Sequence, residues 1–414
     1  MLRRDFLNVA TLATLYGACS PILTLGSESD SLPKNVTFRG SYANSKRVFE
    51  TTGKGRVAFL GGSITEMDGY RPMVCEYLRK KFPKTEFDFI AAGISSTCSD
   101  VGAFRLQTDV IKNKPVDLFF VEFAVNDNQD GMFDLEHSIR GMEGVVRHIR
   151  TAYPRVDIVM TFFVNEDLMA QYRAGGVATS INAHRQVAER YEISTIDLAK
   201  EIQEEIDSKK ITWQEFGGVH PAPRGNRICA DMIAALLDQA WEAPTAKEYV
   251  AHAMPDPIDK YSYANAYFRG FSAIETNIGS ILDETSPSKG GFRLYVPDWS
   301  KIPGGFRQNF ADKPFLCAEK PGAEISFEFE GNALGLYVLA GPDAGIVESQ
   351  IDGVDVGKVN AFHAYSGGLH YPRAIMIADA LKSGKHKATI RVSAEKDPKS
   401  AGTALRILQI CVNK

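Results

Sequence analysis

The chain has 414 residues, more than a single hydrophobic core usually serves, so its length predicts two domains. Hydrophobic residues make up 44% of it and charged residues 24%, with a formal net charge of -4 at pH 7. This balance lacks the basic surface of nucleic-acid-binding proteins. Beyond the N-terminus, no apolar run is long enough to span a bilayer. We therefore expect neither a nucleic-acid partner nor an integral membrane span after removal of a signal.

Residues 1–25 have the layout of a bacterial export signal. Arg3 and Arg4 precede a short, mildly apolar stretch, which ends in small residues up to Cys19. Paired arginines in this position are typical of the twin-arginine route, so we expect an exported, periplasmic or extracellular protein. Cys19 is also a candidate lipid anchor. This second option is the less favoured one, because Tyr16 stands where a lipobox prefers leucine.

The cysteines show no spacing typical of a metal site. They lie at positions 19, 75, 98, 229, 317 and 411, without any C-x-x-C pair. Cys75 and Cys229 fall in helical apolar patterns, where buried thiols are common, and pairing among the others remains open. The glycine-rich fingerprint of dinucleotide-binding proteins is missing as well, and so is the phosphate loop of nucleotide-binding proteins. We expect no metal and no cofactor.

Residues 30–242 predict an α/β catalytic domain. Short apolar runs rich in β-branched and aromatic residues predict strands buried on both faces, at residues 57–60, 87–92, 116–125, 156–164 and 194–198. Apolar residues at helical spacing predict helices over residues 70–82 and 135–153. Alternation of this kind forms parallel βαβ units, which predicts a three-layer α/β/α, flavodoxin-like parallel sheet. Ligands bind such sheets at the carboxyl ends of the strands.

The pattern changes after residue 242. Residues 243–262 contain three prolines and predict a linker or a packed connector. Residues 263–414 are dominated by short strand patterns, and Asp352-Gly353 has the composition of a hairpin turn. Short strands separated by Gly- and Asp-rich turns predict an antiparallel β-sandwich accessory domain.

One serine stands out in the catalytic domain. The first apolar run leads directly into Gly61-Gly62-Ser63, and a helical pattern follows. A serine at a tight strand-to-helix turn presents its hydroxyl at the edge of the sheet. Glycines allow the backbone conformation that such a turn needs. Taken alone, this pattern fits an ordinary turn as well as a nucleophile.

Three later segments extend the pattern. Gly93 ends the second predicted strand, Asn126 ends the third, and His220 precedes the last helix of the domain. Together with Ser63, they resemble the four blocks of the SGNH/GDSL hydrolase superfamily, over about residues 50–242. The resemblance implies that Ser63 is the nucleophile and His220 its base. It also implies that the oxyanion hole consists of the N–H groups of Ser63 and Gly93 and the side-chain amide of Asn126. Histidine suits proton transfer near neutral pH, and fixed donors of this kind stabilise developing negative charge.

Two positions depart from the family pattern. Gly62 stands where the better-known motif has aspartate, and Gly217 stands three residues before His220, where the triad acid usually lies. Glycine cannot orient an imidazole. Either Ser63 and His220 work as a dyad with a backbone carbonyl fixing the tautomer, or another carboxylate substitutes. The candidates for that carboxylate are Glu215, which is nearest in sequence, and then Asp127 and Glu66.

Two other residues near the four blocks are candidates for function. Arg71 follows the nucleophile and is either a surface residue at a helix start or an anchor for an acidic or hydroxylated substrate. Cys98 is a candidate catalytic thiol, although no second histidine block is placed to activate it.

The four blocks predict a serine esterase. Expected export, the lack of a lid-like apolar segment and the added β-sandwich favour an O-acetylesterase acting on poly- or oligosaccharides. The alternatives are a lipase or arylesterase of the same superfamily, an acyltransferase, and a non-catalytic glycan-binding protein on this fold. Four side chains are candidates either for a sugar platform or for core packing: Trp299, Tyr365, His370 and Tyr371. The acyl group, the glycan and the oligomeric state are not indicated.

Overall fold

The computed structural model describes residues 32–112, 114–271 and 291–414. The predicted export signal, with Cys19, lies outside these residues. Within them, no helix combines the length and apolar character that crossing a membrane requires. The five cysteines that the structure describes are buried and free.

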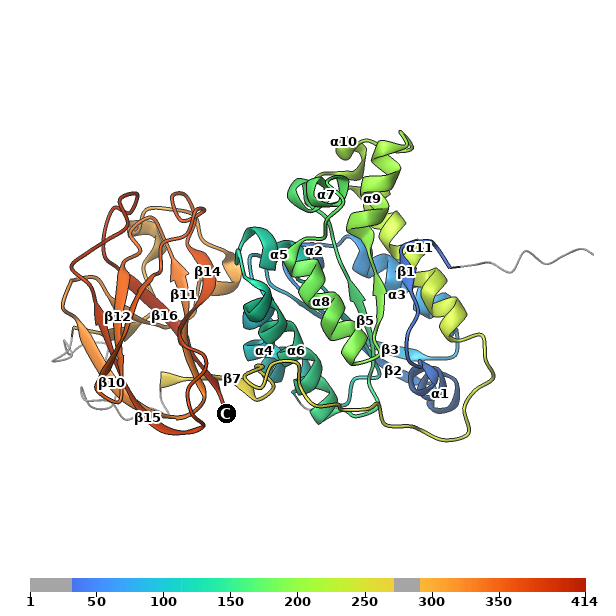
Figure 1. Ribbon diagram of the computed structural model, residues 1–414, viewed down its shortest axis with the longest axis horizontal. Helices are drawn as coiled ribbons and strands as arrows, with labels where there is room; N and C mark the ends of the chain where they lie inside the picture. The colour runs from blue at the N-terminus through green and yellow to red at the C-terminus, as the bar shows by residue number, and fades with distance from the viewer. Residues whose placement is uncertain (1–31, 113, 272–290) are drawn as a thin grey trace, which may run out of the picture. The chain divides into compact units, whose positions relative to one another are not determined.

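A mixed sheet lies at the centre of the first domain, and five of its strands are parallel, as predicted (Figure 1). Its order is β1-β6-β5-β4-β2-β3. The strands are β1 (Val36–Thr37), β2 (Lys54–Gly61), β3 (Glu86–Gly93), β4 (Leu118–Val121), β5 (Asp157–Thr161) and β6 (Ser194–Ile196). The two-residue strand β1, which the sequence pattern did not predict, pairs antiparallel to β6.

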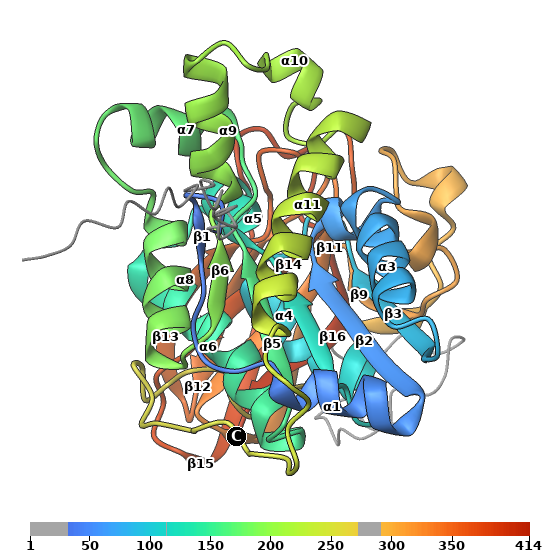
Figure 2. The ribbon, with the colours of Figure 1, turned by 90° about the vertical axis from the view of Figure 1, so that its right-hand side faces the viewer.

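Helices cover both faces of this sheet, which confirms the three-layer α/β/α arrangement. They are α1 (Ala43–Thr52), α2 (Ser63–Glu66), α3 (Tyr70–Lys81), α4 (Ser99–Leu106), α5 (Ala124–Gln129), α6 (Leu135–Ala152), α7 (Glu166–Arg173), α8 (Thr179–Arg190), α9 (Leu198–Asp207), α10 (Trp213–Phe216), α11 (Pro223–Ala240) and the π-helical turn η1 (Gln107–Ile111). Helices α4, α6 and α8 lie on one face, and α1, α3 and α11 lie on the other (Figure 2).

Two strand predictions need correction. Strand β3 is half-exposed rather than buried on both faces, because it forms the edge of the sheet. The run at residues 116–125 was predicted as one strand, but β4 ends at Val121 and α5 begins at Ala124. Two polar residues follow the strand and are buried: Glu122 accepts the Gly62 N–H, and Asn126, in α5, donates a hydrogen bond to Asp130.

The segment 243–262 is a packed connector. Arg47 and Lys46 of α1 donate hydrogen bonds to the carbonyls of Ala246 and Ala243. Further along, Glu143 of α6 accepts the backbone N–H groups of Ile258 and Asp259, at 2.6 and 2.9 Å. The connector therefore follows the surface of the first domain on fixed hydrogen bonds.

The remaining described strands form two antiparallel sheets, which confirms the β-sandwich. The outer sheet has the order β10-β15-β12-β13, and the inner sheet has the order β14-β11-β16-β9-β8, with β7 also paired to β16. The elements are β7 (Ala266–Arg269), β8 (Arg293–Tyr295), η3 (Trp299–Lys301), η4 (Gln308–Phe310), β9 (Phe315–Ala318), β10 (Glu324–Gly331), β11 (Ala333–Ala340), β12 (Ile346–Ile351), β13 (Val354–Asn360), β14 (Tyr371–Ala378), β15 (Gly384–Val392) and β16 (Leu405–Asn413). The predicted turn Asp352-Gly353 joins β12 to β13, with φ of 54° and 80° as this hairpin type requires.

Apolar side chains fill the space between the two sheets, and a second cluster continues from the inner sheet into the first domain. Phe268 of β7 stacks on Phe104 of α4 at 6.2 Å between ring centroids and on Tyr337 of β11 at 5.2 Å. The sandwich is thus packed against the helix that follows the Gly93 loop.

Candidate active site

Ser63 and His220 form the centre of the candidate site. Ser63 is the first residue of α2, directly after β2, and His220 lies in the loop between α10 and α11. The fold brings the His220 Nε2 atom to 2.8 Å from the Ser63 Oγ atom. This is the geometry in which an imidazole can take the proton of a serine hydroxyl.

The ends of β2, β3 and β4 converge on Ser63. Gly61 pairs with Gly93 in the parallel register of β2 and β3, so the segments after both strands begin at the same level. A Cβ atom on Gly93 would lie 2.2 Å from the Glu66 backbone nitrogen. Glycine at this position therefore allows α2 and the end of β3 to approach each other.

Gly62 has a comparable reason to be glycine. A Cβ atom on Gly62 would lie 2.2 Å from Oδ1 of Asn126. In this protein, a side chain at position 62 would therefore collide with Asn126 unless one of the two moved. The close approach also places the Asn126 amide beside the residue that precedes Ser63.

Asn126 is buried and held in one orientation. Its Nδ2 atom donates a hydrogen bond to Oδ2 of Asp130, 2.7 Å away. Because an amide nitrogen carries two hydrogens, this bond leaves the second one for another acceptor. Burial raises the pKa of Asp130 above its usual value.

The structure explains the missing acid at position 217. Gly217 ends α10 with φ of 107°, and a Cβ atom there would lie 2.0 Å from the Ala222 backbone nitrogen. No aspartate fits this position without moving the backbone. Among the described residues, no carboxylate forms a hydrogen bond with His220.

The predicted substitute acids are all bound elsewhere. Glu215 caps α10 through Thr212 and forms an ion pair with Arg224 at 3.2 Å. Asp127 is buried and accepts hydrogen bonds from Ser99, with His184 Nε2 at 2.9 Å from its Oδ2 atom. Glu66 accepts the Ser95 N–H at 2.9 Å, so it holds the loop after Gly93.

Two buried charged residues near Ser63 were missed by the sequence analysis. Oε1 of Glu122 accepts the Gly62 N–H at 2.9 Å and the Thr65 hydroxyl at 2.7 Å. Arg105 of α4 donates to the carbonyl of Gly61 at 2.9 Å and to that of Ala92 at 2.7 Å. Both residues stand in otherwise apolar runs. A single charged residue in such a run is the sequence feature that could have predicted them.

The remaining candidates near the four blocks make contacts within the chain. Arg71 donates to the Thr65 carbonyl at 3.2 Å and pairs with Asp68 at 2.8 Å. Cys98 is buried, and this burial raises the pKa of its thiol well above the usual value. A catalytic thiolate at Cys98 is therefore disfavoured.

Side chains of the sandwich domain contact two of the loops around Ser63. Nε2 of His363 lies 2.9 Å from the Asp130 carbonyl oxygen, and Arg307 donates a hydrogen bond to the Ser96 hydroxyl.

Of the four aromatic candidates for a sugar platform, Tyr365 is 49% exposed. The other three are buried: Trp299 and His370 contact each other, and Tyr371 stacks on His363 and lies beside Asp130 and Ser96.

Comparisons with known proteins show which family and which fold the chain resembles. Residues 59–228 match the GDSL-like Lipase/Acylhydrolase family. A solved two-domain esterase, CEX, described as active on acetylated mannans and co-crystallised with mannopentaose, is 21% identical, with a TM-score of 0.71 over 92% of this chain and 97% of its own. The structure of the same esterase described without that sugar gives the same values. An acetylxylan esterase from Geobacillus stearothermophilus is 20% identical, with a TM-score of 0.35 over 45% of this chain and 94% of its own.

A comparison with curated proteins gives no match. The similarity to the two-domain esterase confirms the order of an α/β domain followed by a β-sandwich. The matched segment contains Ser63, Gly93, Asn126 and His220. The α/β domain belongs to the GDSL-like lipase/acylhydrolase family, and the protein is an ester hydrolase.

Proposed function

We propose that the protein is an O-acetylesterase that removes acetyl groups from poly- or oligosaccharides, with Ser63 as nucleophile and His220 as general base. The observation that carries this proposal is the 2.8 Å contact between Ser63 Oγ and His220 Nε2 at the carboxyl end of β2. Asn126 and Gly93 lie beside it, where the carbonyl oxygen of a bound ester would acquire negative charge.

The reaction follows from these groups. His220 takes the proton of Ser63 as Oγ attacks the acetyl carbon, and the carbonyl oxygen becomes negatively charged. The N–H groups of Ser63 and Gly93 and the amide of Asn126 stabilise this oxyanion. Collapse breaks the bond to the sugar oxygen, which takes the proton from His220. Water then attacks the acetyl-serine with His220 again as base, releasing acetate and free Ser63.

A dyad accounts for this site better than a triad. Gly217 has no room for a side chain, and the carboxylate of Glu215 is bound in the capping box of α10. Removal of an orienting aspartate costs about 10⁴-fold in turnover in enzymes that depend on it. His220 must therefore be oriented by backbone or packing in this protein.

Two observations and one expectation support a carbohydrate ester as substrate. The two-domain esterase that shares this fold is described as active on acetylated mannans. Tyr365, an exposed aromatic residue, stands near His363, whose ring contacts the carbonyl of Asp130. Polysaccharides lie outside the cell, in agreement with the expected export.

Two measurements test the proposal. Wild type is expected to hydrolyse p-nitrophenyl acetate and to release acetate from acetylated mannan or xylan, whereas Ser63→Ala does neither. Activity retained by Ser63→Ala would exclude Ser63 as nucleophile. Preference for long-chain or aryl esters without acetate release would favour a lipase or arylesterase. Glycan binding without hydrolysis would favour a binding protein, and acetyl transfer faster than hydrolysis a transferase.

We also propose export by the twin-arginine route, on the evidence of Arg3 and Arg4 alone. Fractionation of cells should find the mature protein outside the cytoplasm, and replacing both arginines by lysine should retain it inside. Labelling with a radioactive fatty acid, lost in Cys19→Ala, would instead support a lipid anchor.

A further inference from the structure

One peptide unit next to the nucleophile binds an ionisable side chain at each end. The carbonyl of Gly61 accepts a hydrogen bond from Arg105 Nη2 at 2.9 Å. The N–H of the following residue, Gly62, donates to Oε1 of Glu122 at 2.9 Å. Both groups belong to the same peptide bond, and the next residue is Ser63.

We propose that Glu122 and Arg105 are positioning residues of the hydrolytic reaction, which fix the Gly61–Gly62 peptide and so hold the Ser63 hydroxyl and N–H in their working orientation. The inference rests on the proposed role of Ser63 as nucleophile. Both side chains are 1% exposed, so they act from behind the turn and do not meet substrate.

Glu122 holds both sides of the turn that carries the nucleophile. The same oxygen that accepts the Gly62 N–H also accepts the Thr65 hydroxyl at 2.7 Å. Ser63 therefore lies between two residues bound to a single carboxylate atom. The other carboxylate oxygen is buried without a hydrogen-bond partner among the described residues.

Arg105 connects the turn to the strand that ends in Gly93. Its second terminal nitrogen donates to the Ala92 carbonyl at 2.7 Å and to Asp109 at 3.0 Å. One guanidinium group thus binds the ends of β2 and β3, the two strands that lead to the Ser63 and Gly93 N–H groups. A planar fork with several donors can hold two carbonyls at once, whereas the single ammonium of lysine cannot reproduce this geometry.

Among the residues that the structure describes, no cation forms an ion pair with Glu122. The charged and titratable groups that act on it or feel its charge come from three helices: Arg105 of α4, Tyr70 of α3 and Cys229 of α11. The charge of Glu122 is therefore satisfied mainly by the N–H of Gly62 and the hydroxyl of Thr65, the two residues whose position matters for catalysis.

Four variants and a control test the proposal with p-nitrophenyl acetate. Glu122→Gln and Arg105→Lys are expected to lower kcat by about tenfold to a hundredfold, because a displacement of about 1 Å at a reacting group has effects of this size. KM should change by less than about threefold, since neither residue contacts substrate. Thr65→Val should lower kcat several-fold, and Thr65→Ser should restore it.

Glu143→Gln is the matched control. Glu143 is a buried glutamate like Glu122, but the two backbone N–H groups that it accepts belong to the connector, at Ile258 and Asp259. We expect Glu143→Gln to lower the thermal unfolding temperature and to leave kcat unchanged. A general effect of removing buried carboxylates would lower kcat in both glutamate variants.

The outcomes separate this inference from the proposed function. If Ser63→Ala is inactive while Glu122→Gln and Arg105→Lys keep kcat within about twofold of wild type, the inference is wrong and the nucleophile stands. If Ser63→Ala stays active, the proposed nucleophile is wrong. Should the two charge variants fail to fold, equal kcat for Thr65→Val and Thr65→Ser would overturn the inference, and loss in Thr65→Val alone would support it.

Discussion

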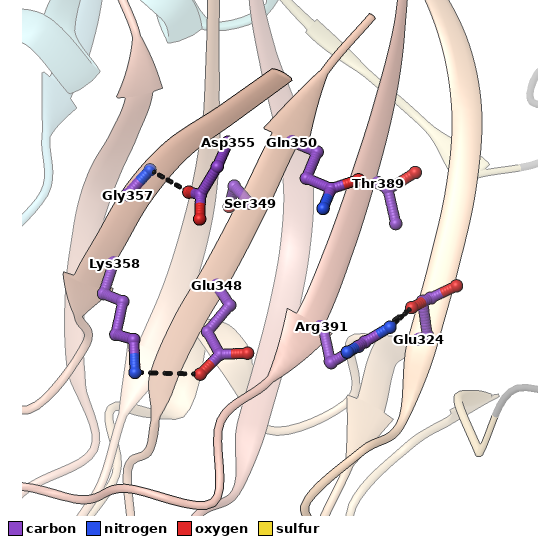
Figure 3. A pocket seen from close by; sticks show the side chains of 9 residues that line it. All are labelled: Glu324, Glu348, Ser349, Gln350, Asp355, Gly357, Lys358, Thr389 and Arg391. Carbon is purple, nitrogen blue, oxygen red and sulfur yellow. Dashed lines mark hydrogen bonds and ion pairs between the residues drawn. The ribbon is translucent and has the colours of Figure 1, made fainter. Parts of the chain in front are cut away.

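Charged side chains differ in their partners between two regions of the molecule. On the outer sheet they pair with each other, whereas behind Ser63 they bind the backbone. On the outer sheet, a hollow of about 390 Å³ is lined by charged and polar residues, in which Arg391 pairs with Glu324 at 2.6 Å and Lys358 with Glu348 at 3.1 Å (Figure 3). These side chains are partly or largely exposed. Their charges cancel each other and face water.

Glu122 and Arg105, in contrast, are buried and bind backbone groups of the turn before Ser63. Exposed ion pairs contribute about 0–1 kcal/mol each, because solvent screens them. A buried charge is expensive to remove from water and must be compensated by hydrogen bonds. The comparison teaches that exposed charges can neutralise each other in pairs, whereas buried side chains directed at the backbone can fix the geometry of a turn.

The largest effect should come from His220, the proposed base. We expect His220→Ala to lower kcat by about 10⁴-fold or more, because removing one member of a cooperating nucleophile and base disables both. Steady-state hydrolysis of p-nitrophenyl acetate measures this loss, and circular dichroism serves as the control for folding. A loss below tenfold would show that another group activates Ser63.

A second variant tests whether the backbone of the loop before His220 excludes a side chain at position 217. Restoring the usual acid as Gly217→Asp should destabilise the fold by about 3 kcal/mol or more, since its Cβ would lie 2.0 Å from Ala222 N. The matched variant is Gly218→Asp, where φ is also positive but nothing lies within 4 Å, so only backbone strain of about 1 kcal/mol is expected. Urea unfolding compares the two. Higher activity in Gly217→Asp with unchanged stability would contradict this account.

A pH series tests the burial of Glu122. Burial raises the pKa of its carboxyl from 4.5 to about 7, so the folded protein keeps a proton that the unfolded chain releases. The contribution of this proton to the free energy of unfolding is complete below about pH 4.5. It is lost as the pH rises through 7, a change of up to about 3 kcal/mol. Glu122→Gln lacks this titration.

The measurement is the difference in the free energy of unfolding between wild type and Glu122→Gln at pH 5 and pH 8. Other buried acids with a raised pKa, such as Asp117, are common to both proteins and cancel in the difference. We expect wild type to lose stability relative to the variant as the pH rises. A difference that does not depend on pH would show that Glu122 has an ordinary pKa.

The smallest effect should come from the outer sheet. We expect Arg391→Ala and Glu324→Ala each to change the free energy of unfolding by less than about 1 kcal/mol, with kcat unchanged. A double-mutant cycle gives the coupling between them. Coupling above about 2 kcal/mol would remove the contrast between the two regions.

The sequence predicted those features of the fold that depend on local pattern. Buried strands read as apolar runs, and Asp352-Gly353 predicted its hairpin because both residues adopt positive φ. The two-residue strand β1 carries too short a pattern to be recognised. Strand β4 was predicted too long because Glu122 and Asn126 follow it within a run that is otherwise apolar.

The site was predictable only in part. The four blocks named Ser63 and His220, and the structure places their side chains in contact. Arg105 and Glu122 escaped prediction because their partners are backbone atoms 44 and 60 residues away, and no local pattern records such a bond. The reason for Gly217 lay in the backbone of Ala222, which becomes visible only once the loop is folded.

Covalent labelling of Ser63 tests the central claim most directly. A fluorophosphonate should react with wild type once per chain, with the adduct on the peptide that contains Ser63 and fluoride released. His220→Ala should be labelled at least about a hundredfold more slowly, because its serine lacks a base. An adduct on a different residue, or labelling of His220→Ala at the wild-type rate, would contradict the proposed pair of nucleophile and base.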